Sequence, residues 1–179
     1  RRFCGKGSST DMADVWSRLV AEVPNGWVVL STILRLGLAA GLGAIMGLDR
    51  ERLHKAAGLR THMLVSLGSA LFTIVSAYGF HEFLVGGGQI VRADPTRIAA
   101  QVVTGIGFLG AGAIIRQGLS VRGLTTAATL WIAAAIGLAA GAGYYSAAIV
   151  TTAAVLIALG PLRYVARRTL RPDYRRIDT

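Results

Sequence analysis

Residues 105–112 read GIGFLGAG, and they lie in a run from residue 98 to residue 115 that contains no charged side chain. The first six letters match Gly-x-Gly-x-x-Gly, which binds dinucleotides when a strand precedes it and an acid follows about 20 positions later. No acidic residue occurs between Asp94 and Asp173, and the preceding RIAAQVVT (97–104) is poor in the Val and Ile of a buried strand. The context excludes a nucleotide site and favours a glycine-rich helix.

The composition of the chain indicates a membrane protein. The 179 residues are 53% hydrophobic and only 16% charged, and 23 of them are glycine. A soluble domain of this length needs more charge to cover its surface. The charges are clustered between long apolar runs, as in proteins that cross the membrane several times. We therefore predict an all-α membrane protein.

Five apolar runs are long enough to cross the hydrocarbon core, which takes about 20 helical residues. These runs are residues 27–48, 63–80, 98–115, 124–142 and 147–162. They predict five transmembrane helices in a membrane domain over 27–162. The flanking parts are an extracytoplasmic segment, 1–26, with an interfacial helix at 11–23, and a basic cytoplasmic tail, 163–179.

The basic residues predict the orientation of these helices. With the N-terminus outside, 12 arginines and lysines fall on the inner side and six on the outer side. Basic loops resist translocation, so this distribution favours an outer N-terminus and an inner C-terminus.

Small residues four positions apart predict close helix packing in lipid. Such pairs are Gly37–Gly41, Gly43–Gly47, Gly107–Ala111 and Gly137–Gly141. We expect packing roles for Gly41, Gly43, Gly47, Gly105, Gly107, Gly110 and Gly112. A glycine-lined path or an unwound segment at 105–112 is the alternative. Glycine faces left over within one chain predict a two-fold homodimer.

A weak internal repeat appears at an offset of 65 residues. It aligns GLRT at 58–61 with GLTT at 123–126. Each copy places a short basic loop between two apolar runs, which predicts two helical hairpins of the same orientation. Chance similarity between small-residue helices is the rival explanation.

Two long motifs resemble a known family. GLDRERLHKAAGLRTHMLVSLGSALF at 47–72 and DPTRIAAQVVTGIGFLGAGAIIRQGLSVRGLTTAATLW at 94–131 closely resemble the MgtC/SapB family of bacterial inner-membrane proteins. The resemblance covers roughly residues 30–160. It implies five helices, growth at low magnesium and, in pathogens, survival inside macrophages. It implies no enzymatic activity and no cofactor. The best-studied member is thought to restrain the F-type ATP synthase and adjust membrane potential, and magnesium transport by it is doubted.

The family pattern can be carried over at matching letters. It implies functional positions at Asp49, Arg50, Arg60, Thr61, Arg97, Gln101, Arg122, Thr125 and Thr126. Two of these depart from the usual pattern, because Asp49 stands where Glu is more common and Thr125 where Asn is often found. We expect no counterpart of the family's soluble, ACT-like C-terminal domain.

Asp49 is the acidic residue whose chemistry is most distinctive. It ends the first predicted helix, where the helix dipole disfavours an acid, so it needs a cationic partner. We expect that partner to be Arg60 or Arg122. Asp49 then either binds a cation or proton or forms a structural salt bridge between the inner loops. One carboxylate is few ligands for magnesium, so Asp49 is only a candidate and we predict no metal site.

Other polar residues in the apolar runs have two interpretations each. Arg35 either extends to the outer headgroups or pairs with Gln101 or with Thr and Ser hydroxyls. A polar seam is predicted from Gln101, Thr104, Thr125, Thr126 and Thr129, unless these hydroxyls bond to their own helices. The spacing of His54, His62 and His81 does not suit a transition metal, and Cys4 is alone.

Two classes of function remain open at this stage. The first is a regulatory partner of another membrane complex, which is favoured by the placement of Asp49, Arg60 and Arg122 at the inner rim. The second is a small transporter of magnesium, another ion or a solute, acting as an oligomer. The basic inner surface also predicts contact with anionic lipid, and nothing indicates nucleic acid.

Overall fold

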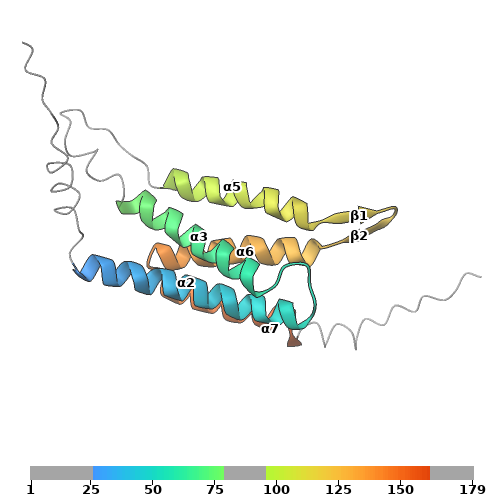
Figure 1. Cartoon of the computed structure of the whole chain (residues 1–179), viewed down its shortest axis with the longest axis horizontal. Helices are drawn as coiled ribbons and strands as arrows, with labels where there is room; N and C mark the ends of the chain where they lie inside the picture. The colour runs from blue at the N-terminus through green and yellow to red at the C-terminus, as the bar shows by residue number, and fades with distance from the viewer. Residues whose placement is uncertain (1–25, 79–95, 162–179) are drawn as a thin grey trace, which may run out of the picture. The chain divides into compact units, whose positions relative to one another are not determined.

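The computed structural model describes residues 26–78 and 96–161, and these ranges contain five helices and one small sheet (Figure 1). In chain order the elements are α2 (Gly26–Arg52), α3 (Leu59–Tyr78), α5 (Thr96–Ala113), β1 (Ile115–Gln117), β2 (Ser120–Arg122), α6 (Leu124–Gly141) and α7 (Tyr145–Leu159). The predicted all-α class is confirmed, with one short hairpin added. The predicted interfacial helix and basic tail lie outside the described residues, as do Cys4 and His81.

The chain divides into two compact units, residues 1–31 and residues 32–179. The boundary falls inside α2, so residues 26–31 are the part of the first unit that the structure describes. There the Ser31 hydroxyl donates to the Val28 carbonyl at 2.9 Å, and Trp27 is exposed. All the packing described below belongs to the second unit.

Among the described helices, α2, α3 and α6 are long and apolar enough to cross a membrane. Helix α7 is apolar but has 15 residues, and α5 has 18. Large apolar side chains such as Phe72, Phe108 and Val150 are exposed, as expected for helices that face lipid. The membrane class is confirmed, whereas the five spans and the two hairpins stay predictions.

Two of the helices extend beyond their apolar runs into charged sequence. Helix α2 continues past residue 48 to Arg52, and α3 begins at Leu59 rather than at residue 63. Backbone hydrogen bonding does not stop where the hydrocarbon core ends, because water and headgroups solvate the charged side chains there. The connecting loop is consequently short, and the Lys55 N–H donates to the Arg50 carbonyl at 3.0 Å.

Helix α6 ends in a tight turn between the two apolar runs 124–142 and 147–162. The Tyr144 N–H donates to the Ala139 carbonyl at 2.8 Å, and the Gly143 N–H donates to the Ala140 carbonyl at 3.1 Å. This is the Schellman arrangement, and Gly143 adopts the left-handed φ of 87° that it requires. The turn sends α7 back along α6.

A β-hairpin forms the predicted basic loop between α5 and α6. Its strands pair antiparallel with Gln117 opposite Ser120, which leaves a two-residue loop. Gly118 begins this loop with a φ of 61°, as a type II′ turn requires. The hairpin carries Leu119 at its fully exposed tip.

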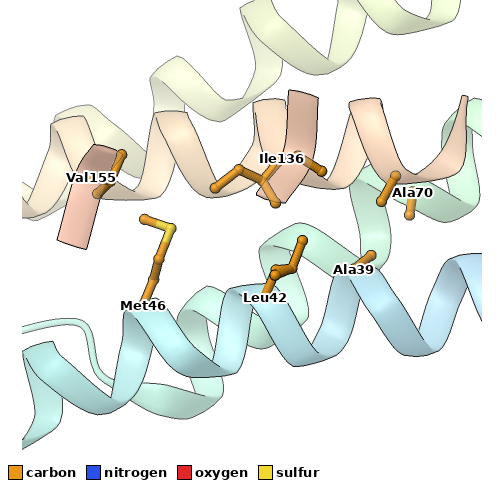
Figure 2. Close-up of a cluster of buried hydrophobic side chains, with 8 residues drawn as sticks. Ala39, Leu42, Met46, Ala70, Ile136 and Val155 are labelled. Atoms are coloured by element: carbon orange, nitrogen blue, oxygen red, sulfur yellow. The ribbon is translucent and has the colours of Figure 1, made fainter. Parts of the chain in front are cut away.

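The hydrophobic core of the second unit lies where α2, α3, α6 and α7 meet. Helix α6 is central, because nine of its 18 residues are buried, whereas α5 buries only Ile106. Figure 2 shows Met46 and Leu42 of α2 pointing toward α6 and α7, where they pack with Ile136 and Val155. Alanines fill the remaining core positions, so the helices approach one another closely.

Glycines determine which helices come closest. A Cβ on Gly137 would overlap the Ser66 carbonyl oxygen, and one on Gly141 would lie 2.6 Å from the Ala70 carbonyl oxygen. Helix α6 therefore packs on α3 backbone to backbone, as small residues allow in lipid. Gly43 and Gly47 bring α2 equally close to the start of α3, at His62 and Leu59.

The other predicted packing glycines have a different environment. A Cβ placed on Gly110 would lie 3.7 Å from the Ala127 side chain. Among the described residues, no atom comes within 4 Å of a Cβ placed on Gly41, Gly105, Gly107 or Gly112. These four glycines therefore form open helix surface in the single chain.

Candidate functional site

The candidate functional site is a set of polar side chains buried between the helices. The buried polar side chains in the described ranges are Arg50, His62, Ser66, Ser69, Thr126, Thr129 and Thr152. Burial of such groups is costly in a membrane unless each one has a hydrogen-bonding or charged partner. We call Arg50, His62, Ser66, Thr126 and Thr129 the polar cluster.

His62 lies at the centre of the polar cluster and is completely buried. Its Nδ1 is 2.9 Å from the Gly58 carbonyl oxygen, and its Nε2 is 3.1 Å from the Thr129 hydroxyl. Because a carbonyl oxygen can only accept, Nδ1 carries the hydrogen of the first bond. The imidazole thus links α3 to α6, and Arg50 is near enough to act on it electrostatically.

Hydroxyl groups extend the polar cluster along the helices. The Ser66 hydroxyl donates to the Ala39 carbonyl at 2.8 Å, which joins α3 to α2. The Thr129 hydroxyl also lies 2.9 Å from the Thr126 carbonyl within α6, and its one hydrogen is shared between that carbonyl and His62 Nε2. Other buried hydroxyls also bond to their own helices, such as Thr152 to the Ala148 carbonyl at 2.8 Å. These bonds tie the donors to the backbone.

The predicted polar seam forms only in part. Thr126 and Thr129 come together with His62, as described above. Gln101 is exposed and lines an apolar groove of about 510 Å³ between α3 and α5. Thr104 is exposed and bonds to the Ala100 carbonyl of its own helix, and Thr125 is also exposed. The seam therefore runs through α3 and α6 rather than through α5.

Asp49 does not form the ion pair that we predicted. Its Oδ2 is buried, and it has no hydrogen-bond partner among the described residues. Arg60 and Arg122 are both exposed, one in the first turn of α3 and the other in β2. The predicted ion pair does not form, because an exposed guanidinium gains little from pairing.

Glu51, which was not among the predicted site residues, is the acidic residue that organises this loop. Its Oε2 accepts a hydrogen bond from the Leu59 N–H at 2.7 Å. This bond satisfies one of the N–H groups at the start of α3 that have no partner within the helix. The negative charge of Glu51 also interacts favourably with the positive end of the helix dipole. A Cβ on Gly58 would lie 2.9 Å from the same oxygen, so the small residue leaves room for the bond.

Arg35 bonds to neither Gln101 nor a Thr or Ser hydroxyl among the described residues, so that predicted pairing is wrong, and its extension to the headgroups stays a prediction. Its guanidinium donates to the Gly141 carbonyl at 2.9 Å and to the Tyr78 hydroxyl at 3.3 Å. It also lies 5.6 Å from the centre of the Tyr78 ring. The carbonyls at the end of α6 have no partner within the helix and carry partial negative charge, so they attract the cation. Arg35 therefore ties α2 to the ends of α3 and α6.

Replacing Arg35 with Met is expected to destabilise the fold by about 1–3 kcal/mol, since it removes a charge-assisted hydrogen bond and leaves the Gly141 carbonyl without it. Arg35→Lys should cost less, because an ammonium group can still donate to that carbonyl. The check is the unfolding transition of both variants in detergent. An equal loss of stability in Arg35→Lys and Arg35→Met would contradict a role that depends on the charge of Arg35.

The remaining sequence-predicted residues lie on the surface. Arg60 and Thr61 are exposed in the first turn of α3, and Arg97 is exposed in the first turn of α5. Within the described ranges, no group of three or more His, Cys, Asp and Glu side chains is placed to hold a metal ion.

A helical bundle with an apolar surface, several helices long and apolar enough to cross a membrane, and a buried polar cluster defines an integral membrane protein. Residues 36–168 match the model of the MgtC family, and the chain belongs to this family. The resemblance found in the sequence motifs is thereby confirmed.

Three relatives show the extent of the similarity. The chain is 46% identical over 142 residues to YhiD of Escherichia coli (strain K12), which covers 79% of this chain and 65% of that protein. It is 48% identical over 122 residues to MgtC of Brucella abortus (strain 2308), which covers 68% of this chain and 47% of that protein. It is 40% identical over 145 residues to SapB of Bacillus subtilis (strain 168), which covers 79% of this chain and 60% of that protein. The chain thus spans less than two thirds of the length of these relatives. No solved structure matches it.

Proposed function

We propose that the chain is a multi-pass inner-membrane protein of magnesium homeostasis that regulates another membrane complex and does not conduct magnesium itself. Family membership supports the connection with magnesium, because the relative YhiD is provisionally described as a magnesium transporter. The proposed partner is the F-type ATP synthase, through which the chain would adjust membrane potential during growth at low magnesium and intracellular survival.

The observation that carries this proposal is the chemistry of the polar cluster. Magnesium is bound by carboxylates, other oxygen ligands and retained water. The polar cluster instead holds the imidazole of His62 and the cation of Arg50, and the Ser66 and Thr129 hydroxyls donate to backbone carbonyls. A positive charge in this interior raises the energy of a divalent cation. A magnesium path through one chain is therefore unfavourable.

Transport by an oligomer is the second candidate function. Its path would have to run between copies, along a surface such as the groove between α3 and α5. The side chains that line this groove are apolar except for Ser69 and Gln101. Such a lining suits helix packing or lipid better than a hydrated ion, so we rank regulation first.

Inverted membrane vesicles provide the test of regulation. Acidification is measured after addition of ATP and, separately, after addition of NADH, in vesicles with and without the chain and with equal amounts of ATP synthase. Regulation of the synthase lowers the ATP-driven signal and leaves the respiratory signal unchanged. An equal decrease in both signals indicates a leak through the chain and contradicts the proposal, as does no decrease in either.

The orientation is testable at two exposed positions. Single cysteines at Leu119, on the hairpin tip, and Tyr144, in the turn after α6, are introduced into a Cys4→Ser background. With the N-terminus outside, a membrane-impermeant maleimide should label Tyr144→Cys in intact spheroplasts and Leu119→Cys only after permeabilisation. Both side chains are well exposed, at 101% and 70%, so access to the reagent is controlled by the membrane. The opposite labelling pattern would overturn the orientation.

A further inference from the structure

A cavity of about 580 Å³ lies at the end of the second unit where α2 ends and α6 begins. Its polar lining consists of Arg50, Lys55, Thr125 and Thr126, and apolar side chains of β2, α6 and α7 complete it. Both charged groups are cations, and none of the described residues that line the cavity is acidic. The cavity therefore presents positive charge and hydrogen-bond donors.

The two cations of this cavity differ in burial, because Arg50 is buried and Lys55 is exposed. Arg50 is only 3% exposed, so its charge acts through a medium of lower dielectric constant than water. The Lys55 N–H donates to the Arg50 carbonyl at 3.0 Å, which keeps the loop beside the end of α2. An anion in the cavity therefore meets the buried charge of Arg50, and the exposed Lys55 side chain lines the same space.

Neutral donors face the same space. Thr126 is 4% exposed and lines the cavity. Among the described residues, the hydroxyl of Thr129 bonds to the Thr126 carbonyl and not to its hydroxyl. A phosphate in the cavity would accept a hydrogen bond from the Thr126 hydroxyl. Helix α6 also begins here. Its N-cap residue is Gly123, which has no side chain to cap the helix, and the first N–H groups of a helix can donate to an anion.

We propose that this cavity binds a phosphate group, with Arg50 and Lys55 as charge partners and with Thr125, Thr126 and the start of α6 as neutral donors. A phosphate accepts several hydrogen bonds at once, which matches a site rich in donors and poor in acceptors. The group has two possible sources, an anionic lipid headgroup or soluble phosphate. The proposal goes beyond the regulatory function and does not depend on it.

The test uses the full chain in nanodiscs made of phosphatidylcholine. Inorganic phosphate is titrated in one arm by calorimetry. In the other arm phosphatidylglycerol is mixed into the disc, and the lipid retained by the protein is measured by native mass spectrometry. The variants are Lys55→Gln and Thr126→Val. The control is Arg60→Gln, which removes one charge from an exposed position outside the cavity.

We expect Lys55→Gln to weaken binding by about tenfold, since it removes one charge-assisted contact, and Thr126→Val to weaken it by less. Arg60→Gln should change binding less than twofold. Saturable phosphate binding with this pattern identifies a soluble ligand, and saturable retention of phosphatidylglycerol with this pattern identifies a headgroup. Binding of neither probe overturns the proposal. Equal losses in Lys55→Gln and Arg60→Gln also overturn it, because they indicate diffuse attraction to a basic surface. If Thr126→Val does not fold, Lys55→Gln and its control decide, because Lys55 is exposed.

Discussion

Replacement of Gly137 with Leu is expected to eliminate folded protein from the membrane. A Cβ at this position would overlap the Ser66 carbonyl oxygen, and a backbone atom cannot move aside as a flexible side chain can. Separating α3 from α6 would also break the bond between His62 and Thr129. Overpacking of this kind costs about 3 kcal/mol or more, a large part of the stability of a small protein. Folded yield by size-exclusion chromatography in mild detergent is the measurement.

Gly107→Leu is the matched control, because it adds the same side chain to a glycine with open space around it. Its folded yield should equal that of the wild type. The same variant tests our proposal that the open glycine faces join two copies of the chain, since a dimer built on this face would become a monomer. Comparable losses of yield for Gly137→Leu and Gly107→Leu would show that the packing contacts are wrongly assigned.

Replacement of His62 with Leu has the second-largest expected effect, a destabilisation of about 2–4 kcal/mol. It removes two hydrogen bonds, and the buried Thr129 hydroxyl loses one of its partners. The imidazole bonds to the Gly58 carbonyl and to Thr129, so its loss weakens both the start of α3 and its contact with α6. Thermal unfolding in detergent, followed by the fraction that remains monodisperse, measures the effect.

His62→Gln is the control for this prediction. Its amide can donate or accept at about the distance of the imidazole Nε2, so it can keep the bond to Thr129 while losing the bond to Gly58. We expect its stability to fall between that of the wild type and that of His62→Leu. If His62→Leu is as stable as the wild type, the buried imidazole contributes only its volume.

The membrane class and the close-packing positions could be predicted because they depend on local sequence. Charge-free runs reveal apolar helices, and glycines four apart reveal faces that allow close approach. Gly43–Gly47 and Gly137–Gly141 do approach α3 in the structure, whereas Gly107 has open space. Spacing alone cannot separate the two cases, because it does not specify which face of a helix meets a neighbour.

The polar cluster was predicted only in part, because its hydrogen bonds join distant segments. Arg50, Thr126 and Thr129 were selected from the sequence, whereas Ser66 and the central role of His62 were missed. Thr61 was selected from the family motif, but one residue along a helix rotates the side chain by about 100°, and it is His62 that faces the core. The spacing of His62, Ser66 and Ser69 follows one helix face, and all three are buried. That polar face was the available signal. The contact of Arg35 with Gly141 spans 106 positions, and no local pattern indicates it.

The central claim is that the chain acts on a partner and does not carry magnesium, and magnesium flux into proteoliposomes tests it most directly. The purified chain is reconstituted alone, with a magnesium-sensitive dye inside and a membrane potential imposed across the bilayer. A magnesium ionophore serves as the positive control, and protein-free liposomes serve as the baseline. The account predicts uptake no faster than the baseline for the wild type. Saturable uptake that is lost in Asp49→Asn would contradict it and would establish the chain as a transporter.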